Sequence, residues 1–384
     1  MTWIALFSLI SWAVLVWGRG DFWKVDFNKP VPTPESWPDV AVVIPARNEA
    51  EGIGQTVSSL LSQEYPGKVA VVVVDDHSDD GTADVARAAA QDLTGGNHGE
   101  RLHILSGREL ESGWAGKVWA MEQGLRWVRE NAPDAQYILF TDGDIEHAPG
   151  QLKDLVARAL WGRFDLTSLM VKLSCKTLPE RLLIPAFVHF FRMLYPFHLI
   201  ADPGSKVAGA AGGVMLIRRH MLDQIGGFEV LKGALIDDCT LAGVIKGRMG
   251  RLWLGLAPKT RSLRIYRDWL EIWNMIARSA FDQLNHSLIL LIGTVVAMLL
   301  VFVGPVVLTV AGGNWQWAGV LCWVAMAMTY WPMLRYYGVN TMWSPILPVV
   351  SLFYLGATLA SAWRHLNGRG GQWKGRIEAG RTNQ

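Results

Sequence analysis

Charged side chains are scarce in this chain and missing from whole stretches of it. Only 18% of the 384 residues are Asp, Glu, Lys or Arg, and the first eighteen residues contain none. Between Gln283 and Trp363 the only one is Arg335. The rest is normally charged, and the net charge of +2 gives no overall field that would attract nucleic acid. This distribution indicates a soluble domain held between membrane segments.

Cysteine is also scarce, and its positions exclude two common uses. Cys175, Cys239 and Cys322 share neither a CxxC pattern nor the spacing of a metal site. No disulfide framework is therefore implied, which fits a reducing cytosol for the soluble part.

The uncharged N-terminal stretch predicts a membrane anchor. Thr2–Gly18 is apolar and about as long as the shortest spanning helices, and no cleavage pattern of a signal peptide follows it. Arg19 and Lys24 come next, and the positive-inside bias places the domain that follows in the cytoplasm. We therefore expect residues 1–20 to be an uncleaved anchor, with a buried core helix as the alternative.

The C-terminal region 285–363, whose only charged residue is Arg335, predicts further membrane segments. Ser287–Ala311 is long enough to span, Trp317–Leu334 and Ile346–Trp363 are candidates, and Trp and Tyr gather at their ends. One anchor plus three spans would put the C-terminus outside, whereas the basic tail 364–384 favours the inside. Either one of the late segments does not cross the membrane, or the tail is an exception to the positive-inside bias. The number of spans and the side of the C-terminus therefore stay open.

The region between, residues 38–282, has the pattern of a parallel α/β domain. Continuous apolar runs at Val40–Ile44, Lys68–Val74, Leu102–Leu105 and Tyr137–Phe140 alternate with helical segments, including one that places Ile53, Val57, Leu60 and Leu61 on one face. In such sheets ligands bind beyond the carboxyl ends of the strands. Acidic clusters follow two of the runs there, at Asp75–Asp76 and at Asp142-Gly143-Asp144.

Three later segments complete the expected domain. Arg181–Ala201 is apolar but broken by Pro185 and Pro196 and dotted with His and Arg, which suits either a helix in the membrane interface or a pair of core helices. GAAGG, residues 209–213, permits close approach of the backbone to a ligand and is followed by the strand VMLI. Leu235–Lys246 is expected to be a helix that starts near Asp237 and Asp238.

The acidic clusters have residue types that suit diphosphate chemistry. Asp142 and Asp144, one residue apart, suit a hard cation such as Mg²⁺, which takes one or two carboxylates and fills its shell with water and phosphate oxygens. Such a metal neutralises charge on a departing phosphate. The same DGD sequence also occurs in plain turns.

Each of the other polar residues near the strand ends can be interpreted in two ways, as a ligand-binding residue or as a structural one. Asp76 can accept a hydrogen bond from a bound base or cap its loop. Lys117, at a helix start, can reach a phosphate oxygen or be a solvated side chain. Arg47 and Glu49 can bind a nucleotide or pair with each other.

Asp237 and Asp238 are adjacent carboxylates in an otherwise apolar run, ALIDDCTLAG. Within reach of an incoming hydroxyl, one of them can act as a general base. Asp is also favoured at the start of a helix by free N–H groups and the helix dipole. Asp237 near the cap with Asp238 as base satisfies both.

The ordered set PARNE, DDHSDDGT, GWAGK, TDGD, GAAGG and IDDCTLA resembles the family 2 glycosyltransferases over roughly residues 41–282. The resemblance implies the GT-A nucleotide-sugar fold, a mainly parallel sheet with flanking helices, and inverting transfer from a nucleotide-diphosphate sugar with Mg²⁺ or Mn²⁺. It implies that Asp76 recognises the base, that Asp142 and Asp144 hold metal and diphosphate, and that Asp238 is the catalytic base. On this basis the donor side comprises Pro45, Arg47, Glu49, Asp75, Asp76, Lys117 and Asp142, and the acceptor side comprises Gly212, Gly213 and Asp237.

SGWAGKVWAMEQG, AAGGVMLIRR, GALIDDCTLAGVIK and RLWLGL further resemble the hopene-associated glycosyltransferases of bacterial hopanoid clusters. That resemblance implies a UDP-sugar donor, a lipid hydroxyl as acceptor, a multi-pass protein of the inner membrane and enzymes of hopanoid synthesis as partners. The chain is also similar to ceramide- and carotenoid-type transferases. It lacks the Q-x-x-R-W motif of processive members, and Arg264-Ile-Tyr-Arg267 occupies that region, so a single transfer is expected.

Three alternatives remain. A polyprenyl-phosphate sugar transferase shares the fold and uses a phosphate acceptor. A dinucleotide dehydrogenase needs a glycine-rich turn after the first strand, where this chain has PARNEAEG. The third is a membrane protein that keeps a nucleotide-binding fold as an assembly module.

Overall fold

The computed structural model describes all residues except 26–28, 94–97, 234–236, 368–371, 374–375 and 378–384, so most of the expected basic tail and the start of the expected helix 235–246 lie outside the described residues. The chain forms two compact units. The helical unit comprises Met1–Asp26, Ser174–Leu199 and Ile265–Gly371, and the sheet unit comprises Phe27–Leu173, Ile200–Arg264 and Gln372–Gln384. Segment 181–201 thus falls mostly in the helical unit, although the sequence placed it within domain 38–282.

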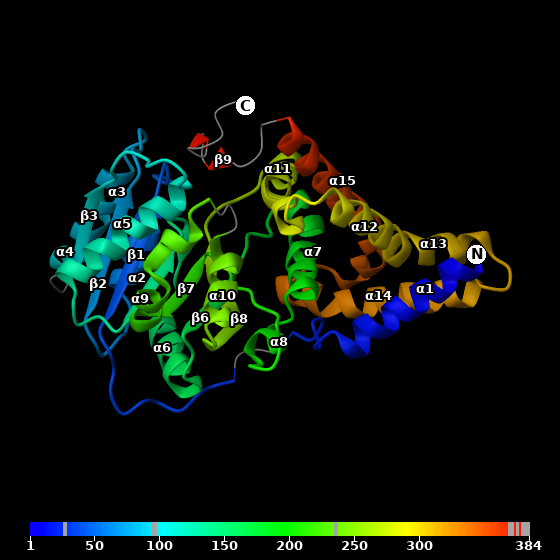
Figure 1. Ribbon diagram of the computed structural model, residues 1–384, viewed down its shortest axis with the longest axis horizontal. Helices are drawn as coiled ribbons and strands as arrows, with labels where there is room; N and C mark the ends of the chain where they lie inside the picture. Colours follow the sequence, from blue (N-terminus) through cyan, green and yellow to red (C-terminus); the bar gives the residue numbers. More distant parts are fainter. Residues whose placement is uncertain (26–28, 94–97, 234–236, 368–371, 374–375, 378–384) are drawn as a thin grey trace. The chain divides into compact units, whose positions relative to one another are not determined.

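The four apolar runs form the parallel half of the sheet. They are β1 (Val40–Ala46), β2 (Val69–Asp75), β3 (Leu102–Ser106) and β4 (Tyr137–Thr141). The sheet order is β3-β2-β1-β4-β7-β6-β8-β5, and the first three ladders are parallel (Figure 1). Every residue of β1 and β4 is buried, which explains why these strands read as continuous hydrophobic runs.

The second half of the sheet is mixed, but four of the seven strand pairings in the whole sheet are parallel, as expected of a mainly parallel sheet. It contains β5 (Ile145–Glu146), β6 (Leu166–Lys172), β7 (Val214–Arg218) and β8 (Leu252–Ser262). β7 is antiparallel to both β4 and β6, β6 and β8 are parallel, and β5 is antiparallel to β8. Because β7 runs in reverse, the glycines that precede it lie at the same edge as the carboxyl ends of β4 and β6.

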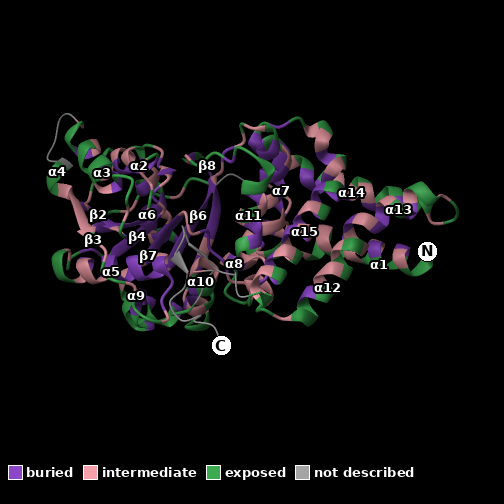
Figure 2. Cartoon of the chain, turned by 90° about the horizontal axis from the view of Figure 1, so that it is seen from above, coloured by how far each residue is buried: buried purple, intermediate pink, exposed green. Residues whose placement is uncertain are grey.

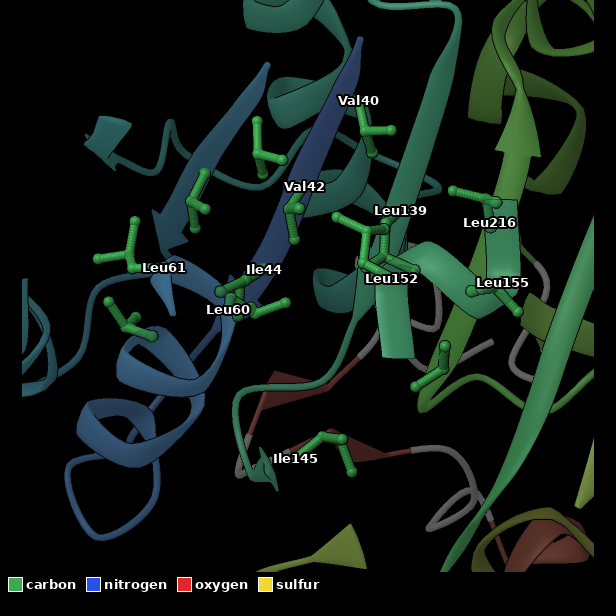
Figure 3. Close-up of a cluster of buried hydrophobic side chains, with 14 of the residues drawn as sticks. Val40, Val42, Ile44, Leu60, Leu61, Leu139, Ile145, Leu152, Leu155 and Leu216 are labelled. Carbon is green, nitrogen blue, oxygen red and sulfur yellow. The ribbon is translucent and has the colours of Figure 1, made fainter. Parts of the chain in front are cut away.

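Helices cover both faces of this sheet. α2 (Ile53–Leu61), α3 (Thr82–Gln91) and α6 (Gln151–Gly162) pack on the face that carries Val42 and Ile44. Figure 3 shows Leu60 and Leu61 of α2 and Leu152 and Leu155 of α6 around these strands, and Figure 2 shows the strands as buried. The four helix positions expected to share a face, Ile53, Val57, Leu60 and Leu61, are all buried.

α5 (Gly116–Asn131) covers the opposite face, where a Cβ on Gly124 would lie 2.3 Å from the Val43 side chain. That close approach fixes α5 against β1 and sets the position of its first turn. The other elements of the sheet unit are α4 (His98–Arg101), α9 (Arg219–Ile225), η2 (Gly227–Leu231), α10 (Asp237–Gly247) and the short strands β9 (Gln372–Trp373) and β10 (Arg376–Ile377); α8 (Phe197–Ala201) continues from one unit into the other.

The helical unit holds the apolar helices expected from the sequence. Its elements are α1 (Thr2–Ala13), η1 (Val14–Gly18), α7 (Leu178–Leu194), α11 (Trp269–Ser279), η3 (Asp282–Leu284), α12 (Leu288–Met298), η4 (Leu299–Val303), α13 (Gly304–Ala311), α14 (Gln316–Tyr337), η5 (Thr341–Ile346) and α15 (Leu347–Leu366). Among the described residues, three helical segments are long and apolar enough to cross a membrane: Leu288–Ala311, Gln316–Tyr337 and Thr341–Leu366. Thr2–Gly18 is apolar but shorter.

The shorter N-terminal helix is tied to the first long one by side-chain hydrogen bonds. Ser8 Oγ donates to the carbonyl of Leu300 over 2.8 Å, and Trp12 Nε1 donates to that of Val301 over 2.9 Å. Both carbonyls belong to η4, a π-helical turn, where the regular helical hydrogen bonding is interrupted. The side chains of Ser8 and Trp12 therefore supply hydrogen bonds to two carbonyls that lie among apolar residues.

Segment 178–194 is one continuous helix, α7, so the expected break at Pro185 was wrong, whereas Pro196 does separate α7 from α8. α7 starts with a capping box in which Thr177 and Glu180 bond to each other's backbone N–H groups. It buries Glu180, His189 and Arg192 together with its apolar side chains. This burial fits a helix packed in a core, and a position in the membrane interface stays a prediction.

Candidate functional site

The candidate residues gather at one edge of the sheet because of the strand directions. Ala46, Asp75 and Thr141 end β1, β2 and β4, so Arg47, Asp76 and Asp142 come directly after the three strands. At the same edge Thr141 pairs with Val214, the first residue of β7, which follows Gly212 and Gly213. Thr141 Oγ1 donates to the carbonyl of Gly213 over 2.7 Å, which holds the glycine turn against the end of β4.

Lys117 joins the DGD turn to the late aspartate pair. It lies in the first turn of α5, and its Nζ is 2.9 Å from Asp142 Oδ1 and 3.3 Å from Asp237 Oδ2. Burial disfavours the ammonium charge, but Asp142 and Asp237 outweigh it and raise the pKa of Lys117 well above its usual value. A permanent positive charge therefore compensates carboxylates that lie 95 residues apart in the chain.

Asp238 is oriented by two backbone donors. Its Oδ2 accepts from Gly212 N–H over 2.8 Å and its Oδ1 from Cys239 N–H over 2.7 Å. Burial and the neighbouring charge of Asp237 raise the pKa of Asp238 to about 6, although Lys117 and both N–H groups act in the opposite direction. Asp238 as a residue is half-buried, and a carboxylate with a pKa shifted toward neutral pH is a candidate for proton transfer.

A side chain at Gly212 would crowd two charged groups. A Cβ there would lie 3.2 Å from Lys117 Nζ and 3.3 Å from Asp238 Oδ2. Both contacts are tighter than ordinary van der Waals distances, so a side chain would push two charged groups apart. The expected close approach of the backbone is therefore seen at Gly212, where the backbone lies against Lys117 and Asp238.

Asp144 lies beside Asp142 and is held from the end of β8. Its backbone carbonyl accepts from Leu263 N–H over 2.7 Å, and its Oδ2 accepts from Ser262 Oγ over 3.2 Å. Burial and the charge of Asp142 raise the pKa of Asp144, and Ser262 and Arg264 oppose this. Sequence reasoning did not select Ser262 or Arg264 for the site, since nothing in the pattern shows that β8 ends beside the DGD turn.

These carboxylates fit a divalent cation that is shared with a ligand. Among the described residues, no group of three or more His, Cys, Asp or Glu side chains is arranged to hold a metal. Asp142 and Asp144 alone would supply its protein ligands, which is the number Mg²⁺ commonly uses when phosphate and water complete its shell. Burial and the charge of Asp142 both raise the pKa of Asp144, and a bound cation would act in the opposite direction.

The PARNE loop lies over the DGD turn and beside Asp76. A Cβ on Gly143 would be 3.1 Å from the Glu49 side chain, and Arg47 donates to the carbonyl of Asp76 over 2.6 Å. Arg47 is also 3.8 Å from Asp76 Oδ2, and His77 Nδ1 lies 3.4 Å from Oδ1. Asp76 is fully buried, so Arg47 covers the side chain expected to recognise the base.

The other residues predicted to bind the nucleotide-sugar donor make contacts within their own loops and strand. Asp75 Oδ1 accepts from Ser78 N–H over 3.2 Å, and Glu49 N–H donates to Thr82 Oγ1 over 2.9 Å. Pro45 is a buried residue of β1. These contacts fix the loops after β1 and β2, and the assigned donor-side roles remain predictions.

Comparison with known proteins agrees with the family resemblance expected from the sequence. Residues 41–226 match the family model described as Glycosyl transferase family 2. The chain is 33% identical over 108 residues to Glycosyltransferase AglE of Haloferax volcanii, covering 28% of this chain and 31% of that protein. It is 30% identical over 142 residues to a 4,4'-diaponeurosporenoate glycosyltransferase of Staphylococcus haemolyticus, covering 36% and 32%. The chain thus spans about a third of the length of these relatives.

Among solved structures, a mannosyltransferase of Pyrobaculum calidifontis in complex with GDP-Man and Mn²⁺ has a TM-score of 0.55 and 18% identity, with 94% of this chain and 99% of that chain covered. At this identity the likeness concerns the fold, and the expected α/β fold of the GT-A type is confirmed. Residues 41–226 are thus similar in sequence to the family 2 glycosyltransferases, the class of enzyme expected from the sequence, and the chain shares the fold of a mannosyltransferase structure.

Proposed function

We propose that the chain is a membrane-bound inverting glycosyltransferase that moves a sugar from a nucleotide-diphosphate sugar, a UDP-sugar in the first instance, to a lipid hydroxyl. One observation carries the proposal: Lys117 contacts both Asp142 and Asp237, which brings Asp238 to the DGD turn. A pair of carboxylates suited to a diphosphate-bound cation and a carboxylate suited to a general base thus share one edge of the sheet.

Each residue has a role in this reaction. Mg²⁺ or Mn²⁺ held by Asp142 and Asp144 would offset the negative charge that develops on the departing diphosphate. The Lys117 ammonium lies beside Asp142 and adds a second positive charge near the leaving group. The N–H groups of Gly212 and Cys239 hold Asp238 in one orientation, so that its carboxylate can take the proton of the acceptor hydroxyl.

The bonds change as in a single displacement. The acceptor oxygen forms a bond to the anomeric carbon while the bond from that carbon to the phosphate oxygen breaks. The nucleoside diphosphate leaves with the bonding electrons, Asp238 keeps the proton, and the configuration inverts. On the donor side Arg47 lies where a nucleotide would enter, and Asp76 beneath it remains the proposed base acceptor.

The membrane part of the proposal rests on the apolar helices. Three segments are suited to spanning by length and hydropathy, and Thr2–Gly18 is the proposed anchor. We propose an inner-membrane, multi-pass protein with residues 38–282 in the cytoplasm, as the charges after the first helix favour. A lipid acceptor suits this setting, and a relative named as a 4,4'-diaponeurosporenoate glycosyltransferase supports an apolar acceptor. A hopanoid acceptor and partners from hopanoid synthesis are proposed from the sequence resemblance.

A screen of the purified full-length chain tests the proposal. UDP- and GDP-sugars are offered with bacterial lipid extracts in detergent, with Mg²⁺, Mn²⁺ or EDTA, and product masses are determined. We expect a lipid that has gained one sugar, formed only with metal. A product that is a polyprenyl phosphate sugar would replace the hydroxyl acceptor with a phosphate. Nucleotide binding without turnover on any donor would favour an assembly module.

A further inference from the structure

The irregular segment between α8 and β7, residues 202–212, ends at the N–H group that orients Asp238. We propose that Lys246, at the far end of α10, is a positioning residue that holds this segment, the glycine loop, so that the Gly212 N–H stays on Asp238. The inference rests on the proposed transferase function, because it assigns Lys246 to the base of that reaction.

α10 contacts the glycine loop and its start at three levels. Near the start of the helix, Asp238 accepts from Gly212 N–H, and Cys239 Sγ lies 3.6 Å from the carbonyl of Ala210. Two turns later, Lys246 Nζ donates to the carbonyls of Val207 over 2.6 Å and Ile200 over 2.9 Å. Residues 239 and 246 are seven apart, so they lie on one side of the helix. The loop is therefore held along the whole length of α10.

Lys246 bonds to two carbonyls on either side of the turn in the glycine loop. Residues 202–212 form neither helix nor strand, and the bonds within the turn, from Ser205 N–H to the carbonyl of Asp202 and from Val207 N–H to Ser205 Oγ, leave these two carbonyls to Lys246. Ile200 and Val207 flank the exposed turn that contains Asp202 and Gly204, and one ammonium group links their carbonyls. Bonds from a charged donor are about twice as strong as neutral ones. Lys246 is half-buried, and this burial lowers the pKa of its ammonium group.

The other support of the loop acts at a single residue. Ser168 Oγ of β6 accepts from Ala211 N–H over 2.9 Å and donates to the Ala211 carbonyl over 3.1 Å. Ser168 therefore fixes Ala211 to the sheet, whereas Lys246 links Val207 to Ile200 at the other end of the loop. Loss of Lys246 is expected to release the loop toward Gly212 and weaken the bond to Asp238.

The experiment compares Lys246→Met and Lys246→Arg in the full-length chain, with Arg101→Met as the matched control. Arg101 also donates to two backbone carbonyls, those of Val69 and Leu61, but at the amino end of β3, away from the site. The first readout is the alkylation rate of Cys239 in a background in which Cys175 and Cys322 are replaced by Ser. The second is the acidic limb of the kcat profile against pH.

We expect Lys246→Met to speed alkylation of Cys239 about tenfold, because a released loop exposes the thiol. The acidic limb should move to higher pH, because Asp238 loses an N–H that favours its ionised form, while Asp237, Lys117 and Cys239 N–H still act on it. Lys246→Arg should keep the wild-type alkylation rate and the wild-type position of the acidic limb. Arg101→Met should change neither of them.

Unchanged alkylation and an unmoved limb in Lys246→Met would overturn the inference, as would equal effects of Arg101→Met. The alkylation rate needs no turnover, so it is informative even if no donor is used. If Lys246→Met speeds alkylation of Cys239 but the wild-type protein transfers no sugar, Lys246 does hold the loop, and the proposed transferase function is rejected instead.

Discussion

At the scale of single residues, the site is organised by one ammonium group among carboxylates. Asp142, Asp237 and Asp238 would repel one another if nothing lay between them, and Lys117 contacts the first two directly. The same charge lowers the pKa of Asp238, which burial and Asp237 raise. The site thus keeps a base that is ionised at neutral pH in spite of its surroundings.

The pH dependence of transfer follows from these charges. Asp238 has a pKa of about 6, so its protonated form, which cannot accept a proton, prevails at lower pH. We expect kcat to fall as pH drops through about 6. Lys117→Met removes a charge that lowers this pKa, so the limb should move to higher pH, and kcat at neutral pH should fall by about 10²-fold. Lys153→Met, on α6, serves as the control, and an unmoved limb in Lys117→Met would contradict the assignment of Asp238.

The close approach at Gly212 gives a second prediction. Gly212→Ala places a Cβ 3.2 Å from Lys117 Nζ and 3.3 Å from Asp238 Oδ2, so these groups must separate. We expect transfer to fall at least about tenfold with little loss of stability, since ~1.4 kcal/mol in the barrier is a tenfold change in rate. Gly243→Ala on α10 is the control, because nothing lies within 4 Å of its added Cβ. Wild-type kcat in Gly212→Ala would show that this contact is unimportant.

At the scale of elements, Glu180 fixes the start of α7. Its buried carboxylate accepts from Ser174 Oγ, from the N–H groups of Lys176 and Thr177, and from Tyr266 N–H over 2.7 to 3.0 Å. Two segments far apart in the chain, residues 174–177 and 266, therefore depend on one side chain.

Glu180→Ala should destabilise the helical unit, because it leaves buried donors without acceptors. The expected cost is ~3 kcal/mol or more, measured by thermal unfolding in detergent. Glu271→Ala is matched to it: Glu271 has the same position in α11 and accepts from Arg267 N–H over 2.8 Å, but it is exposed. Its loss should cost no more than ~1 kcal/mol. Equal losses would show that burial of Glu180 does not matter.

The sequence allowed only some of the elements to be predicted. β1 and β4 are continuous apolar runs because both faces of the sheet are covered there. β6 was missed because it buries the polar residues Thr167 and Ser168, and β8 because Gly255 and Pro258 interrupt it. The candidate residues were predicted one by one, but the contact of Lys117 with Asp237 depends on how α5 and α10 pack, which no local pattern records. For the same reason the support of Asp144 by Ser262 was not predicted.

At the scale of the whole molecule, the apolar helices predict insertion into a membrane. Ile292 lies in the segment Leu288–Ala311 and is 64% exposed, so Ile292→Lys would place a charge toward lipid. We expect a cost of ~2.5 to 3.5 kcal/mol and a smaller membrane-inserted fraction, measured by carbonate extraction. Met249→Lys is the control, since Met249 is 92% exposed in the sheet unit. Equal extraction of both variants would argue against a span at this segment.

The most direct test of the central claim is to compare donor binding and transfer in Asp238→Asn and Asp142→Asn. If Asp238 is the base and Asp142 serves the diphosphate, Asp238→Asn should bind the nucleotide sugar with wild-type affinity but lose transfer by at least ~10²-fold. Asp142→Asn should weaken both donor binding and its dependence on metal. Full transfer by Asp238→Asn, or unchanged metal-dependent binding by Asp142→Asn, would contradict the account.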